Sequence, residues 1–315
     1  MRCAVSVDLD SIACYYRIHG LGDAPSELAS AILDRALPRA RALFARHRLR
    51  ATWFVVGRDV DSAGVGGNKT KNSQQLQQLV SEGDELANHS YSHPYDLARL
   101  SPAEVEREIE NCDRVLRSLG ATVRGFRAPG YDVSPVMLEA LVKLGYRYDS
   151  SVFPAPPYYA AKAVVMTALA ALRRPSGAVL TNPRLLAAPP IPYRLAMDSP
   201  WRRGQAPLVE LPIATTPWLR LHAIGTTLIL APAWLRAHLI EGMARRSFWN
   251  LELHGIDFAD AAQDGLPDEL VSRQPDLRLP IDEKLERIDR VLEQVTRRWD
   301  MTTLGEFAAE VQREG

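Results

Sequence analysis

Two aspartates near the start of the chain have the spacing of a paired carboxylate site. Asp8 and Asp10 are separated by one leucine at the end of an apolar segment. Residues two apart in an extended strand point to the same face, so the two carboxylates would lie side by side. Neighbouring carboxylates repel each other and therefore need a cation, a shared proton or contact with water. A solvated strand end, with Asp10 capping a turn, is the alternative interpretation.

Two histidines provide a second candidate group. His89 and His93 lie four residues apart in the segment Asn-His-Ser-Tyr-Ser-His. Residues with this spacing share one face of a helical turn, and they can also converge in a tight loop. Two imidazoles and one carboxylate match the three protein ligands of a catalytic zinc, which keeps a fourth position for water. Two surface histidines would have the same spacing, so that interpretation stays open.

An arginine and a third histidine complete the set of candidate catalytic residues. Arg127 precedes Ala-Pro-Gly, a rigid turn that can hold a guanidinium against a carboxylate and expose backbone N–H groups to an oxyanion. His254 follows a segment predicted to be a strand, and active sites of parallel α/β proteins form where strands end. A plain turn and a partly buried structural histidine are the alternatives.

Apolar, β-branched segments alternate with amphipathic ones along the chain. The predicted strands are 3–7, 51–56, 85–87, 125–127, 208–212 and 248–253. The predicted helices are 26–45, with Ser26 as N-cap, 73–82, 101–119, 134–144 and 282–298. This alternation predicts an α/β fold with a mostly parallel sheet, either open or closed into a barrel. Residues 154–207 are rich in Pro and Ala, which predicts an insertion within a single domain spanning residues 1–315.

Composition argues against several classes of protein. The 315 residues include 38 Lys and Arg and 38 Asp and Glu, so the chain lacks the positive field of a nucleic-acid-binding protein. A hydrophobic content of 46% argues against disorder. Three cysteines with no CxxC pair indicate a reducing compartment. The first residues predict a strand and not a signal peptide, and no apolar run approaches a membrane span, so we expect a cytoplasmic location.

Seven segments in this order resemble the motifs of the polysaccharide deacetylase (NodB homology) family, carbohydrate esterase family 4. They are residues 7–11, 51–57, 88–93, 126–130, 148–151, 252–254 and 301–307. The resemblance covers nearly the whole chain apart from its middle. It implies a distorted (β/α) barrel of the NodB-homology type, enlarged by the Pro- and Ala-rich insertion, and a divalent metal, most often zinc.

The resemblance also implies roles for particular residues. Asp10, His89 and His93 match the metal ligands of the family. Asp8 matches the catalytic base, and Arg127 matches the residue that orients this base. Together they imply a metal-activated hydrolysis at the end of the first strand.

Further positions match supporting roles. His254 matches the general acid, Asp149 the acid that tunes this histidine, and the N–H of Gly130 an oxyanion donor. Ser90 would support the histidine loop by hydrogen bonding. The usual family pattern has two adjacent acids, whereas Leu9 separates them here. This spacing is similar to the branch that includes the deformylase of undecaprenyl-phosphate-linked aminoarabinose, and to deacetylases without assigned substrates.

The resemblance implies removal of an N-acyl group, acetyl or formyl, from an amino sugar. A cytoplasmic location favours an intracellular glycan precursor, linked to a polyprenyl or nucleotide carrier. Residues 158–174 are apolar and end in two arginines, which suits an interfacial helix near anionic lipid. A buried helix covering the barrel is the alternative. Arg194 and residues 201–203 could line a phosphate pocket or lie on a solvated surface, and the oligomeric state stays open.

Two other functions compete with this one. Hydrolysis of a small cyclic amide, as in allantoinase-like relatives, would keep the fold, but some of those enzymes need no metal. A non-catalytic carbohydrate- or lipid-binding module would not need the full set of matched residues. The glycine-rich segment 64–70 does not have the spacing of a phosphate-binding loop, so we interpret it as a mobile loop.

Overall fold

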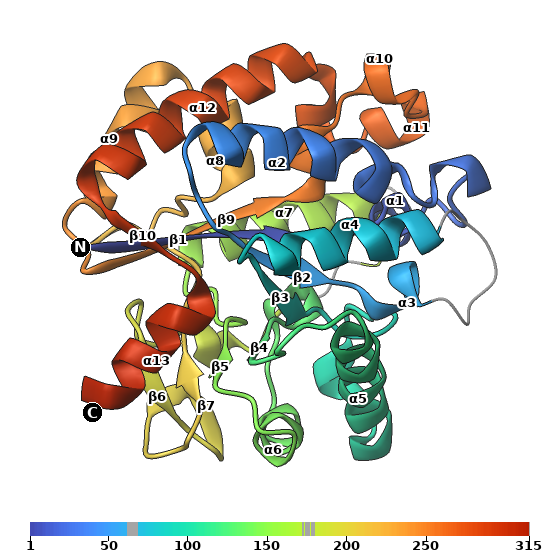
Figure 1. Ribbon diagram of the computed structural model, residues 1–315. Coiled ribbons are helices and arrows are strands. Elements are labelled where there is room, and N and C mark those ends of the chain that lie inside the picture. Colours follow the sequence, from blue (N-terminus) through green and yellow to red (C-terminus); the bar gives the residue numbers. More distant parts are fainter. Residues whose placement is uncertain (62–68, 172, 174–176, 178–179, 315) are drawn as a thin grey trace.

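The computed structural model describes residues 1–61, 69–171, 173, 177 and 180–314. Its strands form a curled sheet surrounded by helices (Figure 1). The parallel strands are β1 (Arg2–Asp8), β2 (Thr52–Val55), β3 (Glu85–Asn88), β4 (Gly125–Phe126), β5 (Tyr148–Asp149), β8 (Val209–Glu210), β9 (Phe248–His254) and β10 (Asp300–Thr302). β1 pairs with β9 along its whole length, with β10 at its start and with β2 at its end. The predicted distorted (β/α) barrel is confirmed.

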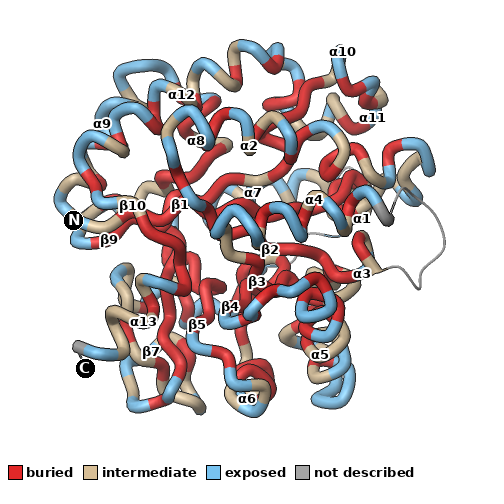
Figure 2. Tube along the Cα trace, in the orientation of Figure 1, coloured by how far each residue is buried: buried red, intermediate tan, exposed pale blue. Residues whose placement is uncertain are grey.

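Helices follow most of the strands and cover the outside of the sheet (Figure 1). They are α1 (Ile12–His19), α2 (Leu37–Arg46), α3 (Gly57–Val60), α4 (Lys69–Ser81), α5 (Pro102–Ser118), α6 (Pro135–Lys143), α7 (Pro156–Ala171), α8 (Gly225–Leu230), α9 (Ala233–Met243), α10 (Ala261–Asp264), α11 (Asp268–Val271), α12 (Ile281–Arg298) and α13 (Leu304–Glu314). Burial is concentrated on the strands and on the inward sides of the helices (Figure 2). Among the described residues, no helix is long and apolar enough to cross a membrane.

Strand β1 shows how the fold supplies both a core and a polar interior. All of its residues after Arg2 are buried, as expected for a parallel strand covered on both faces. Cys3, Val5 and Val7 pack in the large core cluster beneath the helices, whereas Ala4 belongs to a separate cluster. Because alternate residues face opposite sides, Ser6 and Asp8 point the same way as Ala4, away from the large cluster.

The region predicted as a helix over 26–45 is irregular. Ser26–Leu28 form a single 3₁₀ turn, so Ser26 does not cap a long α-helix. Ile32–Ala36 form a π-turn that leads into α2, with the Leu37 N–H bonded to the Ile32 carbonyl. Pro38 explains the wider turn, because proline lacks an N–H and its ring clashes with the carbonyl four residues earlier.

The predicted insertion at 154–207 contains regular structure. It holds α7 and the antiparallel strands β6 (Tyr193–Ala196) and β7 (Ser199–Arg203), and β6 extends the sheet by pairing with β8. Tyr159 is the only buried residue of α7. The alternative of a buried helix covering the barrel is therefore wrong. The glycine-rich segment, Gly64 to Gly67, lies outside the described residues.

A buried lysine ties α12 to the chain that follows β9. Lys284 is completely buried, and its Nζ lies 3.0 Å from Asp276 Oδ2. It also donates to the carbonyl oxygens of Ile256 and Ala259, at 2.9 and 2.8 Å. These carbonyls lie just beyond His254, so this ion pair helps to fix the position of that histidine.

Replacement of this lysine should destabilise the whole domain. We expect Lys284→Met to lower the free energy of unfolding by about 3–5 kcal/mol, because it leaves the Asp276 carboxylate buried without a cation. Denaturant titration followed by circular dichroism measures the change. Lys143 is the matched control, since it pairs with Glu106 on the surface and its side chain is 63% exposed. An equal loss in Lys143→Met, or no loss in Lys284→Met, would contradict this role.

Candidate active site

The parallel register brings the candidate residues together at the carboxyl end of the barrel. Asp8 is the partner of His254 across β1 and β9, and of Phe54 across β1 and β2. Arg127 directly follows β4, and Asp149 ends the neighbouring strand β5. The strands thus carry residues from four distant parts of the sequence to one edge, as the βαβ pattern predicts.

A buried ion pair joins Asp8 to Arg127. Nη1 of the fully buried arginine lies 2.5 Å from Asp8 Oδ1. The rest of the guanidinium donates to the Ser150 carbonyl at 3.1 Å, and to the hydroxyls of Ser6 and Ser150 at 3.0 Å each. The central carbon of the guanidinium, Arg127 Cζ, lies 4.0 Å from the centre of the Phe54 ring. Burying a charge is tolerated when it is paired and hydrogen-bonded in this way.

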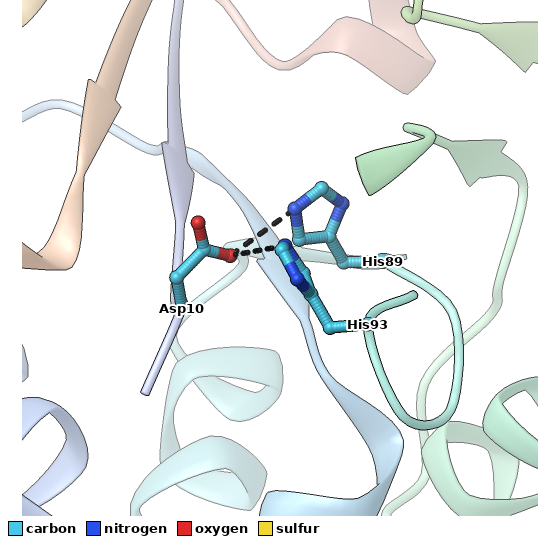
Figure 3. A group of neighbouring side chains, drawn as sticks. All are labelled: Asp10, His89 and His93. Carbon is cyan, nitrogen blue, oxygen red and sulfur yellow. Dashed lines mark ion pairs between the residues drawn. The ribbon is translucent and has the colours of Figure 1, made fainter. Parts of the chain in front are cut away.

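Asp10, His89 and His93 form a buried group that fits a metal ion. Their side chains point toward one another (Figure 3), with Asp10 Oδ1 at 3.2 Å from His89 Nε2 and 3.1 Å from His93 Nε2. A tetrahedral zinc with bonds of about 2.0–2.1 Å separates its ligands by about 3.3 Å. Asp10 Oδ1 is buried without a hydrogen bond from the described residues. The donor set and its spacing therefore suit a divalent cation.

The charges of this group favour an ionised Asp10. Burial alone would raise the pKa of this carboxyl, but the charge of His93 and the close contacts with both histidines hold the pKa well below its usual value. An ionised carboxylate beside two imidazoles is the state that a metal requires of its ligands.

A strained loop, and not a helix, presents the two histidines. Ser90 and His93 have positive φ angles of 61° and 59°, a conformation that costs energy for residues other than glycine. The His93 N–H donates to the Ser90 hydroxyl at 3.1 Å, and the Ser90 N–H donates to Asn88 Oδ1 at 2.8 Å. His89 Nδ1 lies 2.7 Å from the carbonyl of Arg127, which places the proton on Nδ1 and leaves Nε2 free for a metal.

His254 lies across the site, surrounded by negative charge. Its Nε2 is 3.0 Å from the Tyr131 hydroxyl and 3.9 Å from Asp8 Oδ2, and the same hydroxyl donates to Glu252 at 2.7 Å. Burial would lower the pKa of His254, but the charges of Glu252 and Asp8, followed by smaller effects that include Asp257, raise it to about 9. This histidine is therefore protonated at neutral pH and can donate a proton.

Asp149 is buried near the site but does not touch His254. It accepts a hydrogen bond from the Ser151 hydroxyl at 2.6 Å, and this hydroxyl accepts one from the Ala128 N–H at 2.8 Å. Burial raises the pKa of Asp149 to about 6. It makes no hydrogen bond or ion pair with His254, and in this geometry it braces the loop that carries Arg127.

Gly130 occupies a position that requires glycine. Its φ of +72° is unstrained only without a side chain. A Cβ would also lie 3.2 Å from the ring carbon Cδ1 of Tyr95 and 3.3 Å from the Tyr95 carbonyl oxygen. The chain can therefore run along the wall of the cavity at this point.

Six of the candidate residues line one cavity of about 380 Å³: Asp8, Asp10, His89, His93, Gly130 and His254. This volume is typical of small-molecule sites. Arg127 and Asp149 do not line the cavity. Other parts of its wall come from Tyr15, Tyr95, Tyr158, Lys162, His222 and Leu230. The sequence did not single out Tyr131 and Glu252 as site residues. Glu252 could have been found, because it precedes His254 by two positions on the same face of a strand. Tyr131 gave no comparable signal beyond following Gly130.

Residues 28–148 match the family described as polysaccharide deacetylase. Over 160 residues the chain is 28% identical to a peptidoglycan deacetylase of Helicobacter pylori, which covers 50% of this chain and 52% of that protein. Over 94 residues it is 36% identical to a chitooligosaccharide deacetylase of a Bradyrhizobium species, which covers 29% of this chain and 38% of that protein. The chain thus spans about half or less of the length of these relatives.

Solved structures share the fold. A Mycobacterium smegmatis protein assigned to the polysaccharide deacetylases superposes with a TM-score of 0.58 at 17% identity, over 99% of this chain and 90% of that one. A 4-alpha-glucanotransferase of Thermococcus litoralis superposes with a TM-score of 0.56 at 12% identity, over 98% of this chain and 38% of that one. Likeness at such low identity shows the fold alone, and the second case shows that this fold supports more than one activity.

The sequence match, and not the fold, carries the likeness to this family. The matched residues include the two histidines of the candidate metal group and the arginine that holds Asp8. Residues 28–148, less than half of the chain, are therefore similar to the polysaccharide deacetylase family.

Proposed function

We propose that this chain is a metal-dependent hydrolase that removes an N-acyl group from an amino sugar. The observation that carries the proposal is the buried group of Asp10, His89 and His93, whose ligand atoms lie 3.1–3.2 Å apart beside the separately held carboxylate of Asp8. His254 lines the same cavity. The names of the relatives, peptidoglycan deacetylase and chitooligosaccharide deacetylase, support an N-acetylated sugar as the substrate class.

Zinc is the metal that the donor set suits best. Two imidazole nitrogens and one carboxylate oxygen leave a tetrahedral ion one open position, which is the arrangement of catalytic zinc. A bound divalent cation supplies polarisation of the scissile carbonyl and activation of the attacking water. The protein contributes the fixed tautomer of His89, set by its bond to the Arg127 carbonyl.

The remaining residues divide the proton transfers between them. Asp8, held in place by Arg127, accepts the proton of the attacking water. The Gly130 N–H, which makes no hydrogen bond within the described chain, donates to the oxyanion of the tetrahedral intermediate. His254 donates its proton to the departing nitrogen, which is otherwise a poor leaving group. The products are a carboxylate and a free amino sugar.

The acyl group and the carrier of the sugar belong to the same proposal. Acetyl is favoured by the names of the relatives, and formyl by the spacing of Asp8 and Asp10. A polyprenyl- or nucleotide-linked precursor stays a prediction, as does the cytoplasmic location. N-acyl hydrolysis explains the three buried metal ligands next to a protonated histidine better than the two alternatives do. These alternatives are cyclic amide hydrolysis and a non-catalytic binding module.

Loss of the metal ligands should abolish both metal binding and activity. We expect His93→Ala to lose bound zinc and to lower kcat/KM on an N-acetylated chitooligosaccharide by about 10³-fold or more, because the cation supplies several kcal/mol of transition-state stabilisation. Chelation of the unaltered protein should have the same effect, and added zinc should restore activity. Elemental analysis by mass spectrometry measures the metal content.

His47→Ala is the matched control, because that histidine pairs with Asp289 away from the cavity. It should retain both zinc and activity. Full turnover after complete removal of the metal would exclude the proposed mechanism.

The charge on Glu252 should set the alkaline limit of activity. A general acid works only while it is protonated, so activity is present below the pKa of His254 and is lost as the pH rises through it. Among the charged neighbours, Glu252 raises the pKa of His254 the most, and Asp8, Asp10 and Asp257 raise it further. We expect Glu252→Gln to move the alkaline limb of the kcat/KM profile to lower pH, since each pH unit above the pKa removes about tenfold of the protonated form.

Glu210→Gln is the control for this effect, because Glu210 is also buried in the barrel but interacts with Asp149. With the same metal loaded in all proteins, its alkaline limb should stay in place. An unchanged limb in Glu252→Gln, with activity otherwise retained, would remove the proposed influence of Glu252 on His254.

A further inference from the structure

Exposed hydrophobic side chains lie on segments that also line the cavity. Nine large hydrophobic residues are exposed among the described parts of the chain. Six of them lie on three segments that also contribute to the cavity wall or directly follow it. We call these six the apolar rim: Val164, Val165, Trp218, Leu219, Leu230 and Trp234. Soluble proteins rarely leave such patches uncovered unless something binds there.

Helix α7 carries one side of the apolar rim. Tyr158 and Lys162 line the cavity, and Val165, three residues after Lys162 and seven after Tyr158, shares their helical face. Val165 is 57% exposed and Val164 is 70% exposed. Lys162 is the only charged residue of α7, so an almost uncharged helix lies on the surface next to the catalytic residues.

A loop closed by a single bridge carries the second part of the apolar rim. Thr215 and His222 pair as an isolated bridge, and the tip between them exposes Trp218 by 89% and Leu219 by 67%. Trp218 has a positive φ of 67°, a backbone conformation that costs energy for a residue other than glycine. The His222 ring lies 5.4 Å from that of Tyr158, which places the loop beside α7.

The turn between α8 and α9 completes the apolar rim. Leu230 ends α8 and lines the cavity, and Trp234 lies in the first turn of α9 and is 72% exposed. Three separate segments that line the same cavity therefore carry exposed apolar side chains.

The charge of the same region is strongly one-sided. Residues 154–240 contain nine Lys and Arg but only two Asp and Glu, Asp198 and the buried Glu210. The remaining residues carry 29 Lys and Arg against 36 Asp and Glu. The three segments that carry the apolar rim, α7, residues 215–222 and residues 225–236, contain Lys162, Arg220 and Arg236 but no Asp or Glu. The zero net charge of the chain therefore hides a local excess of positive charge on these segments.

We propose that the apolar rim and its basic surroundings dock on an anionic phospholipid bilayer, with the cavity mouth facing the headgroups. Tryptophan prefers the membrane interface, aliphatic side chains enter the acyl boundary, and Lys and Arg bind anionic lipid. Four of the six residues are aliphatic and cannot stack on sugar rings as a carbohydrate platform would. Two copies meeting through this face would bring like charges together. The inference goes beyond the proposed function, since docking does not require a lipid-linked substrate.

Vesicle binding tests this surface. The probe is sedimentation with vesicles of equal parts phosphatidylglycerol and phosphatidylcholine, compared with phosphatidylcholine alone. We expect binding to the anionic vesicles that weakens with salt, and about tenfold weaker partitioning for the double variant Trp218→Ser with Trp234→Ser. The matched control is Leu180→Ser with Ile191→Ser, two exposed residues outside the apolar rim, which should bind as the unaltered protein does.

The outcomes separate docking from catalysis. The Trp218 and Trp234 double variant should deacetylate a soluble N-acetylated chitooligosaccharide at the unaltered rate. No binding by the unaltered protein, or equal binding by the double variant, would overturn the docking proposal while leaving the proposed function intact. A raised KM for the soluble oligosaccharide would instead identify a sugar platform. A dimer that the double variant dissociates would identify a second copy as the occupant, and either result would also overturn docking.

Discussion

The buried ion pair between Arg127 and Asp8 is the interaction on which the site depends. Several carboxyl groups lie at the same edge of the barrel, where burial favours their neutral forms. The Arg127 guanidinium lies against Asp8 and 3.7 Å from Glu252, so it stabilises negative charge that the interior would otherwise suppress. That negative charge in turn keeps His254 protonated. The proposed base and the proposed acid can then lie in one cavity beside a single buried cation.

The fold supplies the partners that this cation needs. Residues on alternating positions of neighbouring strands form a polar layer inside the barrel, where Asn250 bonds to Ser6 and Ser150. These two serines accept the hydrogen bonds of Arg127, so its donors are satisfied without water. The parallel register then sets Asp8 beside His254. The catalytic geometry is therefore a consequence of strand pairing as much as of the site residues themselves.

Features with local causes could be predicted from the sequence, and features with tertiary causes could not. The start of α5 follows from its capping box of Ser101 and Glu104, and the convergence of the metal group follows from ordered family motifs. Strands β6 and β7 escaped prediction because their stability comes from pairing, of β6 with β8 and of β7 with β6, and not from their own sequence pattern. The exposure of α7 could not be predicted either, because an apolar helix has the same composition whether it is buried in protein or lies on the surface. The family resemblance implies that Asp149 tunes His254, but the sequence does not show which side chains Asp149 contacts.

The central claim is that this cavity hydrolyses the N-acyl bond of an amino sugar. Mass spectrometry of the products formed in ¹⁸O-labelled water tests it most directly. The zinc-loaded protein and an N-acetylated chitooligosaccharide should yield free amine and acetate in equal amounts, with one ¹⁸O atom in each acetate, and the Asp8→Asn variant should yield almost none. Absence of both products from the zinc-loaded protein across N-acetylated and N-formylated sugars, free and carrier-linked, would contradict the account.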